Sequence, residues 1–271
     1  MENKEEREDC MRIHQNKPFH FGYNCIVEEE TGGMLMDFGI LKLGKGQLYQ
    51  DNDKKERVYL LLYGEAIFEW EGNSVQVKRD SFLDDEVWSL NVARNIVVSV
   101  TGIAKDTEIS VHKTPNDVDF PSKVYTKAET VIEIRGKGQM NEAGTRIVRT
   151  FMDIYLTPHS NFMIGEDVHY PGKWAGFPSH HHPQPEIYFY KFHPEQGFGL
   201  LKLGDEGVLL EHNDTVKIEP NLVHPQVAAP GYAMYFLWVI RHLDDNPYIK
   251  PVFEPEHIWV EDINAKIWPD I

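Results

Sequence analysis

Residues 176–186, Gly-Phe-Pro-Ser-His-His-His-Pro-Gln-Pro-Glu, constrain the fold of this chain more strongly than any other stretch. Pro183 and Pro185 exclude a helix there, because each lacks an N–H donor and collides with the preceding turn. We therefore expect an extended segment whose side chains alternate between two faces. His181 then points away, and the opposite face carries His180, His182, Glu186, Tyr188 and Tyr190.

Two imidazoles and a carboxylate on one face offer three ligands for a divalent metal ion. The best candidate for a fourth is His224, since a strand that returns across a barrel would bring it opposite the others. His212 is an alternative ligand, although its neighbours are typical of a polar turn. Such a set of ligands would leave coordination positions on the metal ion open for water or substrate, as in catalytic metal sites. A solvated histidine-rich loop is the competing interpretation.

Composition and charge exclude several classes of partner. The net charge of −16 argues against nucleic acid, because phosphate contacts require clustered Lys and Arg. No basic stretch points to a membrane surface, and the longest apolar run, residues 232–240, is far shorter than the ~20 residues of a spanning helix. The charged N-terminus does not resemble a secretory signal. Cys10 and Cys25 suit a reducing compartment, with a single disulfide left open. We therefore expect a cytoplasmic protein.

Short segments rich in Val, Ile, Tyr and Phe dominate the sequence, separated by Gly, Pro or Asn-Asp. No stretch of useful length shows sustained helical periodicity. The pattern predicts an all-β barrel or sandwich. The expected strands cover residues 38–43, 58–63, 66–70, 96–103, 162–170, 187–192, 198–203, 215–218 and 232–240.

A cluster of Pro, Asn and Asp at residues 113–122 predicts a linker. It divides the chain into two domains, residues 1–122 and residues 123–271, each with a comparable run of strands. A faint repeat appears when the halves are compared, as expected if they are structural duplicates.

Only the second half carries the residues of a metal site. Glu56 in the first half and Glu186 in the second each open a pair of strands. Ahead of Glu56, however, stands Asp51-Asn52-Asp53, where histidines would be needed. We expect metal binding in residues 123–271 alone.

Several motifs resemble those of a known family. The spacing Gly176-x3-His180-x-His182-x3-Glu186 is similar to the first cupin motif, with two residues fewer after the glycine, and His224 falls where the second motif supplies its ligand. Longer segments resemble the 5-deoxy-glucuronate isomerases of myo-inositol breakdown, which are similar in turn to the 4-deoxy-threo-hexosulose-uronate ketol-isomerases of pectin breakdown. The matching segments are residues 171–182, 186–192, 194–199, 224–232 and 256–260. The resemblance covers residues 162–260 well and the first half only in layout.

The resemblance implies an all-β fold of two tandem cupin barrels, each a double-stranded β-helix or jelly roll. It implies an isomerase that converts 5-deoxy-glucuronate to 5-dehydro-2-deoxy-gluconate, an aldose–ketose interconversion. The expected partner is a small-molecule sugar acid, and a homo-oligomer is left open. One divalent metal ion is the expected cofactor, with zinc or manganese favoured over iron. Its ligands would be His180, His182, Glu186 and His224.

Catalytic and substrate-binding residues follow from the same face and from the charge of a sugar acid. Glu186 and Tyr190 are the predicted catalytic residues, and Tyr188 is predicted to bind substrate oxygens. Lys173 and Arg241 are candidates for the substrate carboxylate. Aromatic filling of a barrel is the competing interpretation of Tyr188, and the identity of the general base is left open.

Two other functions suit the same four ligands. A cupin dioxygenase would hold iron there, because three histidines and a glutamate do not by themselves select the metal. A non-enzymatic sugar-acid-binding cupin would need a partner module, and neither a helical segment nor a basic patch suggests one. An isomerase of the pectin pathway is a further alternative for the substrate.

Overall fold

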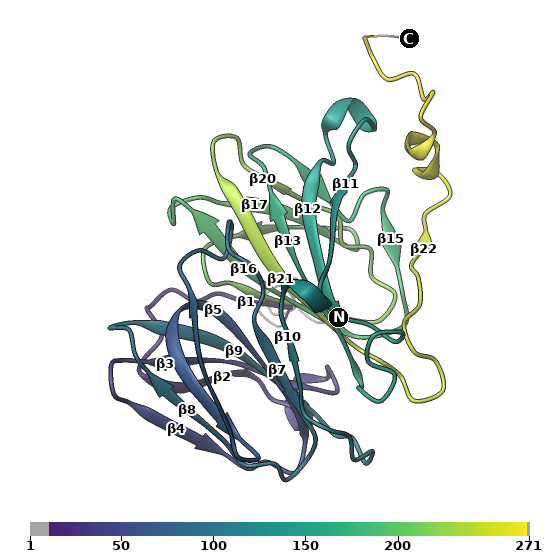
Figure 1. Cartoon of the computed structure of the whole chain (residues 1–271). Coiled ribbons are helices and arrows are strands. Elements are labelled where there is room, and N and C mark those ends of the chain that lie inside the picture. The colour runs from purple at the N-terminus through teal and green to yellow at the C-terminus, as the bar shows by residue number, and fades with distance from the viewer. Residues whose placement is uncertain (1–10, 270–271) are drawn as a thin grey trace. The chain divides into compact units, whose positions relative to one another are not determined.

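The computed structural model describes residues 11–269, whose regular secondary structure is almost wholly β-strand (Figure 1). The all-β prediction is therefore confirmed. Short helical turns interrupt the strands at α2 (Glu29–Gly32), η1 (Lys127–Glu129), η2 (Met140–Glu142) and η3 (Ile258–Glu261). Within residues 11–269, no helix has both the length and the apolar character needed to cross a bilayer.

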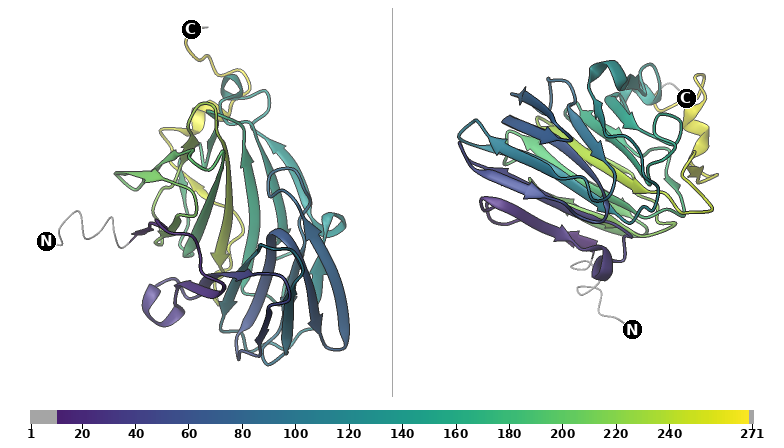
Figure 2. Two further views of the ribbon diagram at one scale, coloured as in Figure 1. Left: turned by 90° about the vertical axis from the view of Figure 1, so that its left-hand side faces the viewer. Right: turned by 60° about the horizontal axis from the view of Figure 1, so that its bottom comes forward.

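The chain forms two compact units, and its segments alternate between them. The C-terminal unit comprises residues 131–150 and 163–271, together with the described part of residues 1–16. The N-terminal unit comprises residues 17–130 and 151–162. Figure 2 shows the strands of each unit as curled sheets. The domain boundary at residue 122 stays a prediction.

The C-terminal unit contains a seven-stranded sheet in the order β1-β19-β16-β21-β13-β12-β11, a four-stranded sheet in the order β14-β20-β17-β18, and the pair β15-β22. Its core includes Tyr188, Tyr190, Val216, Phe236 and Trp238. The strands are β1 (Arg12–Ile13), β11 (Val131–Arg135), β12 (Arg146–Met152), β13 (Phe162–His169), β14 (Trp174–Ala175), β15 (His180–His181), β16 (Glu186–His193), β17 (Gly199–Leu203), β18 (Glu206–Leu210), β19 (Thr215–Ile218), β20 (Gln226–Ala228), β21 (Ala233–Arg241) and β22 (Val252–Phe253).

The N-terminal unit is one branched sheet, in which β10-β7-β5-β9-β3-β2 lie in order and β4, β6 and β8 extend it from β5. Its core includes Leu41, Tyr59, Leu90, Ile109 and Val111. The strands are β2 (Gly22–Val27), β3 (Asp37–Leu43), β4 (Leu48–Asp51), β5 (Glu56–Trp70), β6 (Asn73–Arg79), β7 (Ser89–Val92), β8 (Val98–Gly102), β9 (Thr107–Thr114) and β10 (Lys123–Tyr125).

The two strands expected at residues 58–63 and 66–70 are one bent strand, β5. The sequence suggested a break because Gly64 interrupts the apolar run. Gly64 has φ of 100°, and a Cβ atom there would lie 2.6 Å from the carbonyl oxygen of Asp106. Glycine therefore bends the strand without ending it, close to a shift of register between Leu61 and Tyr63.

Candidate metal centre

The histidine segment is held by backbone contacts with two later parts of the chain. In β15, His180 pairs with Phe253 of β22. The N–H of Asn221 donates to the carbonyl of His182 at 2.8 Å, which joins the segment to the turn that precedes His224. Gly176 has φ of 64°, and a Cβ atom there would lie 2.9 Å from the His224 carbonyl oxygen. The chain therefore passes close to His224 where glycine alone fits easily.

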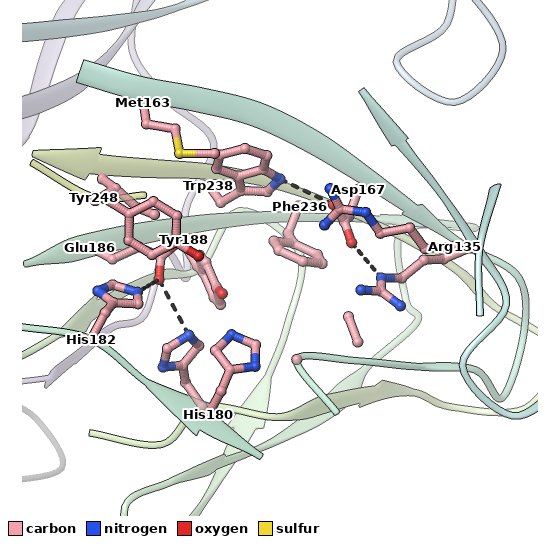
Figure 3. A pocket seen from close by; sticks show the side chains of 15 residues that line it. Arg135, Met163, Asp167, His180, His182, Glu186, Tyr188, Phe236, Trp238 and Tyr248 are labelled. Carbon is pink, nitrogen blue, oxygen red and sulfur yellow. Dashed lines mark hydrogen bonds and ion pairs between the residues drawn. The ribbon is translucent and has the colours of Figure 1, made fainter. Parts of the chain in front are cut away.

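Three of the four predicted ligands converge on a common point. Glu186 Oε2 lies 3.2 Å from His182 Nε2 and 3.4 Å from His224 Nε2 (Figure 3). His182, Glu186 and His224 are all buried, and their ligand atoms lie within 4.8 Å of one another. His180 lines the same pocket beside this trio. Its ring centroid is 5.0 Å from that of His224.

Backbone carbonyls fix how the three imidazoles are oriented. Each ring Nδ1 lies within hydrogen-bond distance of a carbonyl oxygen of its own loop: Pro178 for His180 at 3.1 Å, Gln184 for His182 at 3.0 Å and Leu222 for His224 at 2.8 Å. Because a carbonyl only accepts, Nδ1 must carry the proton. In a neutral ring Nε2 then keeps its lone pair. Metal-binding histidines are typically held by the same kind of contact.

Burial keeps the imidazoles of His180 and His224 uncharged at neutral pH. It lowers the pKa of His180 to about 4 and that of His224 to about 4, against the opposing charge of Glu186. The neutral His224 nitrogen thus directs a lone pair at a carboxylate oxygen, and that contact is repulsive unless a cation lies between the two atoms. Neutral imidazoles and a carboxylate therefore fit a divalent cation, and an oxygen-and-nitrogen set of this kind suits zinc, manganese or iron.

Aromatic side chains form the wall beside the ligands. Tyr188 and Tyr248 line the pocket together with Phe236, and the Tyr248 ring lies 4.9 Å from that of His182. Burial raises the pKa of Tyr188 well above 10, and the negative charge of Glu186 adds to the shift. At neutral pH the Tyr188 hydroxyl is therefore protonated and able to donate a hydrogen bond to a bound molecule.

The far side of the pocket, here called the arginine end, consists of Arg135, Arg146, Asp167 and Trp238. Asp167 Oδ2 accepts from Arg146 Nε at 2.8 Å, and Asp167 Oδ1 accepts from Trp238 Nε1 at 3.0 Å. Figure 3 shows Arg135 and Asp167 across the pocket from His182 and Glu186, with Phe236 between the two groups. The sequence did not predict the arginine end, because its two arginines lie on either side of the turn between β11 and β12, and no recognisable sequence motif marks this hairpin.

The remaining predicted residues lie around the pocket without lining it. Tyr190 is one inward position beyond Tyr188 on β16, and its buried hydroxyl has no hydrogen-bond partner among residues 11–269. Lys173 precedes β14 and is absent from the lining. The Arg241 guanidinium turns to the following loop, where it donates to Asp244 at 2.9 Å. The roles of these three residues stay predictions.

Other candidates from the sequence lie elsewhere. His212 Nδ1 accepts from the N–H of Phe192 at 3.0 Å, on the opposite end of β16 from Glu186. His181 faces away from the pocket, with Nε2 3.7 Å from Glu254. Cys25 is a free, exposed thiol, and Cys10 lies outside the described residues.

Comparison with known proteins gives a consistent picture. A family model described as the KduI/IolB family matches residues 14–260. The 5-deoxy-glucuronate isomerase of Geobacillus kaustophilus (strain HTA426) is 26% identical over 258 residues, which span 87% of this chain and 89% of that protein. The 5-deoxy-glucuronate isomerase of Halalkalibacterium halodurans is 23% identical over 258 residues, spanning 87% of this chain and 91% of that protein.

Solved structures agree in fold. An IolB-like protein from Salmonella typhimurium LT2 has a TM-score of 0.83 at 22% identity, with 92% of this chain and 98% of that chain covered. An oxalate decarboxylase from Lactobacillus farciminis has a TM-score of 0.64 at 12% identity, with 90% and 88% covered. Together with the curled sheets, these likenesses confirm the predicted cupin fold.

Proposed function

The chain belongs to the KduI/IolB family, and on that basis we propose that it is a metal-dependent isomerase of a deoxy sugar acid. The proposed reaction is the conversion of 5-deoxy-glucuronate to 5-dehydro-2-deoxy-gluconate in inositol catabolism, and the curated relatives are named 5-deoxy-glucuronate isomerase. The observation that carries the proposal is the convergence of His182, Glu186 and His224 in a pocket that His180 also lines.

His180, His182, Glu186 and His224 would hold one divalent ion, and zinc or manganese is favoured over iron. When bound, the ion supplies a Lewis acid that polarises the substrate carbonyl. The orientation of the imidazoles supports this assignment, since Nδ1 is occupied by a backbone carbonyl in all three. Metal-binding histidines are commonly oriented by contacts of this kind, which supports the proposed ligand set.

The isomerisation needs no outside oxidant. A proton leaves the carbon that carries a hydroxyl, a proton is added at the neighbouring carbonyl carbon, and the hydroxyl proton passes to the former carbonyl oxygen. Glu186 is proposed to accept and return the carbon-bound proton. The other pocket carboxylate, Asp167, already accepts hydrogen bonds from Arg146 and Trp238, and His169 and Arg146 lower its pKa against the effect of burial. Tyr188 donates its hydroxyl proton in a hydrogen bond to a substrate oxygen and so orients it.

The test is an NMR assay of the metal-free protein reloaded with zinc, manganese or iron. Under anaerobic conditions we expect 5-deoxy-glucuronate to be converted by the zinc or manganese form. A strict need for oxygen would instead indicate a dioxygenase, and conversion of 4-deoxy-threo-hexosulose-uronate alone would indicate the pectin-pathway isomerase. Binding of the sugar acid without turnover in any metal form would contradict the enzymatic assignment.

A further inference from the structure

The arginine end contains a guanidinium whose contacts leave one nitrogen available. Arg146 donates through Nε to Asp167 and through Nη1 to the carbonyl of Gly144 at 3.0 Å. Its Nη2 has no partner among residues 11–269. The side chain is only 12% exposed. A planar guanidinium held at two nitrogens presents the third in a fixed direction, which is the arrangement that binds a carboxylate with geometric selectivity.

Asp167 orients Arg146 and neutralises only one of the two arginine charges at the arginine end. Asp167 is itself held by Trp238, so Arg146 is oriented by a chain of two contacts. Arg135 adds a second positive charge on the pocket lining. Its present partner is Glu133, at 2.8 Å on the same strand, and both side chains are nearly half exposed. An exposed pair of this kind is weak, so Arg135 is able to exchange Glu133 for a bound anion.

We propose that Arg146, assisted by Arg135, is the receptor for the substrate carboxylate and sets the preference for sugar acids over neutral sugars. This inference rests on the proposed function and deepens it. It replaces the sequence-based candidates Lys173 and Arg241 by residues that line the pocket. His182 and Glu186 lie across the pocket from Arg135 and Asp167 (Figure 3), and Asp167 accepts the hydrogen bond of Arg146. A sugar acid with its carbonyl at the metal would therefore direct its carboxylate to Arg146.

The test compares two substrates that differ only at the acid: 5-deoxy-glucuronate and 5-deoxy-glucose, in which a hydroxymethyl group replaces the carboxylate. With Arg146→Gln, we expect kcat/KM for the acid to fall about 10- to 150-fold, mainly through KM, which corresponds to loss of a hydrogen bond to a charged group. The value for the neutral sugar should stay within about threefold. Arg146→Lys should restore part of the preference, since it keeps the charge without the planar fork.

Two further variants guard against a failure to fold, which removing the partner of buried Asp167 could cause. Arg135→Gln alters a half-exposed side chain and should lower the preference for the acid by about 3- to 10-fold. Arg94→Gln removes a surface arginine of the N-terminal unit and is the matched control. Metal content is measured for every variant. The inference is overturned if both substrates lose the same factor in Arg146→Gln and Arg146→Lys, or if Arg146→Lys and Arg135→Gln leave the preference unchanged.

The same experiment separates this inference from the proposed function. If the wild type does not isomerise the acid at all, the proposed function fails. Calorimetry on metal-free protein then measures binding of 5-deoxy-glucuronate reduced at its aldehyde, which has the carboxylate but cannot react. Weaker binding to Arg146→Gln than to Arg94→Gln supports the arginine receptor even then. Equal binding overturns it.

Discussion

At the scale of single residues, local backbone contacts account for most of the candidate metal centre. His180, His182 and His224 each have a backbone carbonyl partner two positions away, so the bend of their own loop sets which nitrogen faces the pocket. Glu186 needs no such contact because it opens β16 and inherits the inward direction of the strand. Short-range geometry therefore sets the orientation of each ligand, which explains why a motif of a few residues could reveal them.

Glu186→Gln tests whether this geometry serves a cation. The substitution keeps the shape of the side chain but removes the charge that faces His182 and His224. We expect the affinity for zinc or manganese to fall by more than the 10- to 100-fold typical when an outer-sphere partner is lost, as measured by competition with a chelating dye. Glu254→Gln, beside outward-facing His181, is the control and should bind metal normally. Unchanged affinity in Glu186→Gln would contradict the assignment of Glu186 as a ligand.

Tyr188 and Tyr190 offer a paired test of which tyrosine contacts substrate. Tyr188 lines the pocket, whereas the buried Tyr190 hydroxyl has no partner in the described chain. We expect Tyr188→Phe to lower kcat by about 10²-fold, the smaller end of the range for a positioned proton donor. Tyr190→Phe should change kcat by less than about threefold and leave the free energy of unfolding equal or higher, because it removes an unsatisfied buried group. Steady-state kinetics and urea unfolding measure both, and the reverse order of effects would restore Tyr190 as the catalytic tyrosine.

At the scale of elements, local sequence patterns predicted some strands with the correct bounds and missed others. β19 was expected at residues 215–218 and has those bounds. Every residue of β11 is exposed, so it shows no alternation. Every residue of β9 is buried, including the polar residues Ser110, His112 and Thr114. The end of this strand was therefore predicted to belong to the linker at residues 113–122.

The dependence on local sequence patterns also explains how much of the site could be predicted. The ligands sit in one motif and in the loop between β19 and β20. Arg135 and Arg146 instead come from strands β11 and β12, where only the pairing of a hairpin brings them to the pocket. Tyr248 reaches His182 from a loop beyond β21. Long-range contacts of this kind have no signature in residue spacing, so half of the pocket could not be anticipated.

The pairing of β15 with β22 is an element whose contribution can be measured separately. Phe253 of β22 pairs with His180, and its ring lies 5.6 Å from the imidazole. We expect Phe253→Ala to weaken metal affinity about 10-fold, because the outer support of a ligand is lost. Val252→Ala, at the exposed neighbouring position, should leave affinity unchanged. Equal affinities in the two variants, again from dye competition, would show that β22 does not support His180.

At the scale of the whole molecule, the two units repeat one pattern of strand pairing. In the C-terminal unit β16 pairs with β19 and β21, and in the N-terminal unit β5 pairs with β7 and β9. Glu186 lies opposite Ile218, the last residue of β19, and Arg57 lies opposite Val92, the last residue of β7. Strand register thus matches Glu186 with Arg57, one position beyond the Glu56 that the sequence suggested.

With that register, Asp51 and Asp53 take the positions of His180 and His182, because both pairs precede the matched residue by the same intervals. Lys113 Nζ lies 2.8 Å from Asp51 and 3.1 Å from Asp53. The Arg57 guanidinium lies 3.4 Å from Asp51. We propose that the side-chain cations of Lys113 and Arg57 stand where the C-terminal unit would hold a metal ion. The chain should therefore bind one metal ion, in residues 123–271.

Asp51→Asn tests this arrangement through stability. Burial alone would raise the pKa of Asp51, but the hydrogen bond and charge of Lys113 outweigh it, so the pKa lies below 3.8. A carboxyl with a lowered pKa stabilises the fold above its unfolded-state value and loses that contribution as the pH falls through the folded-state value. We expect Asp51→Asn to lower the free energy of unfolding by about 3 kcal/mol near pH 7, because two buried cations lose a partner. The difference from wild type should shrink below about pH 4.

Controls for Asp51→Asn distinguish two interpretations of the charged residues in the N-terminal unit: an internal cluster of ion pairs or a second metal site. Asp80→Asn alters a pair with Lys78 in which both side chains are largely exposed, and it should change stability little at any pH. Bound metal, measured by elemental analysis, should stay at one ion per chain in wild type and in Asp51→Asn. It should be lost in His224→Ala. Two ions in the wild type, with one lost in Asp51→Asn, would mean that the carboxylates of the N-terminal unit bind a metal ion and that Lys113 does not stand in its place.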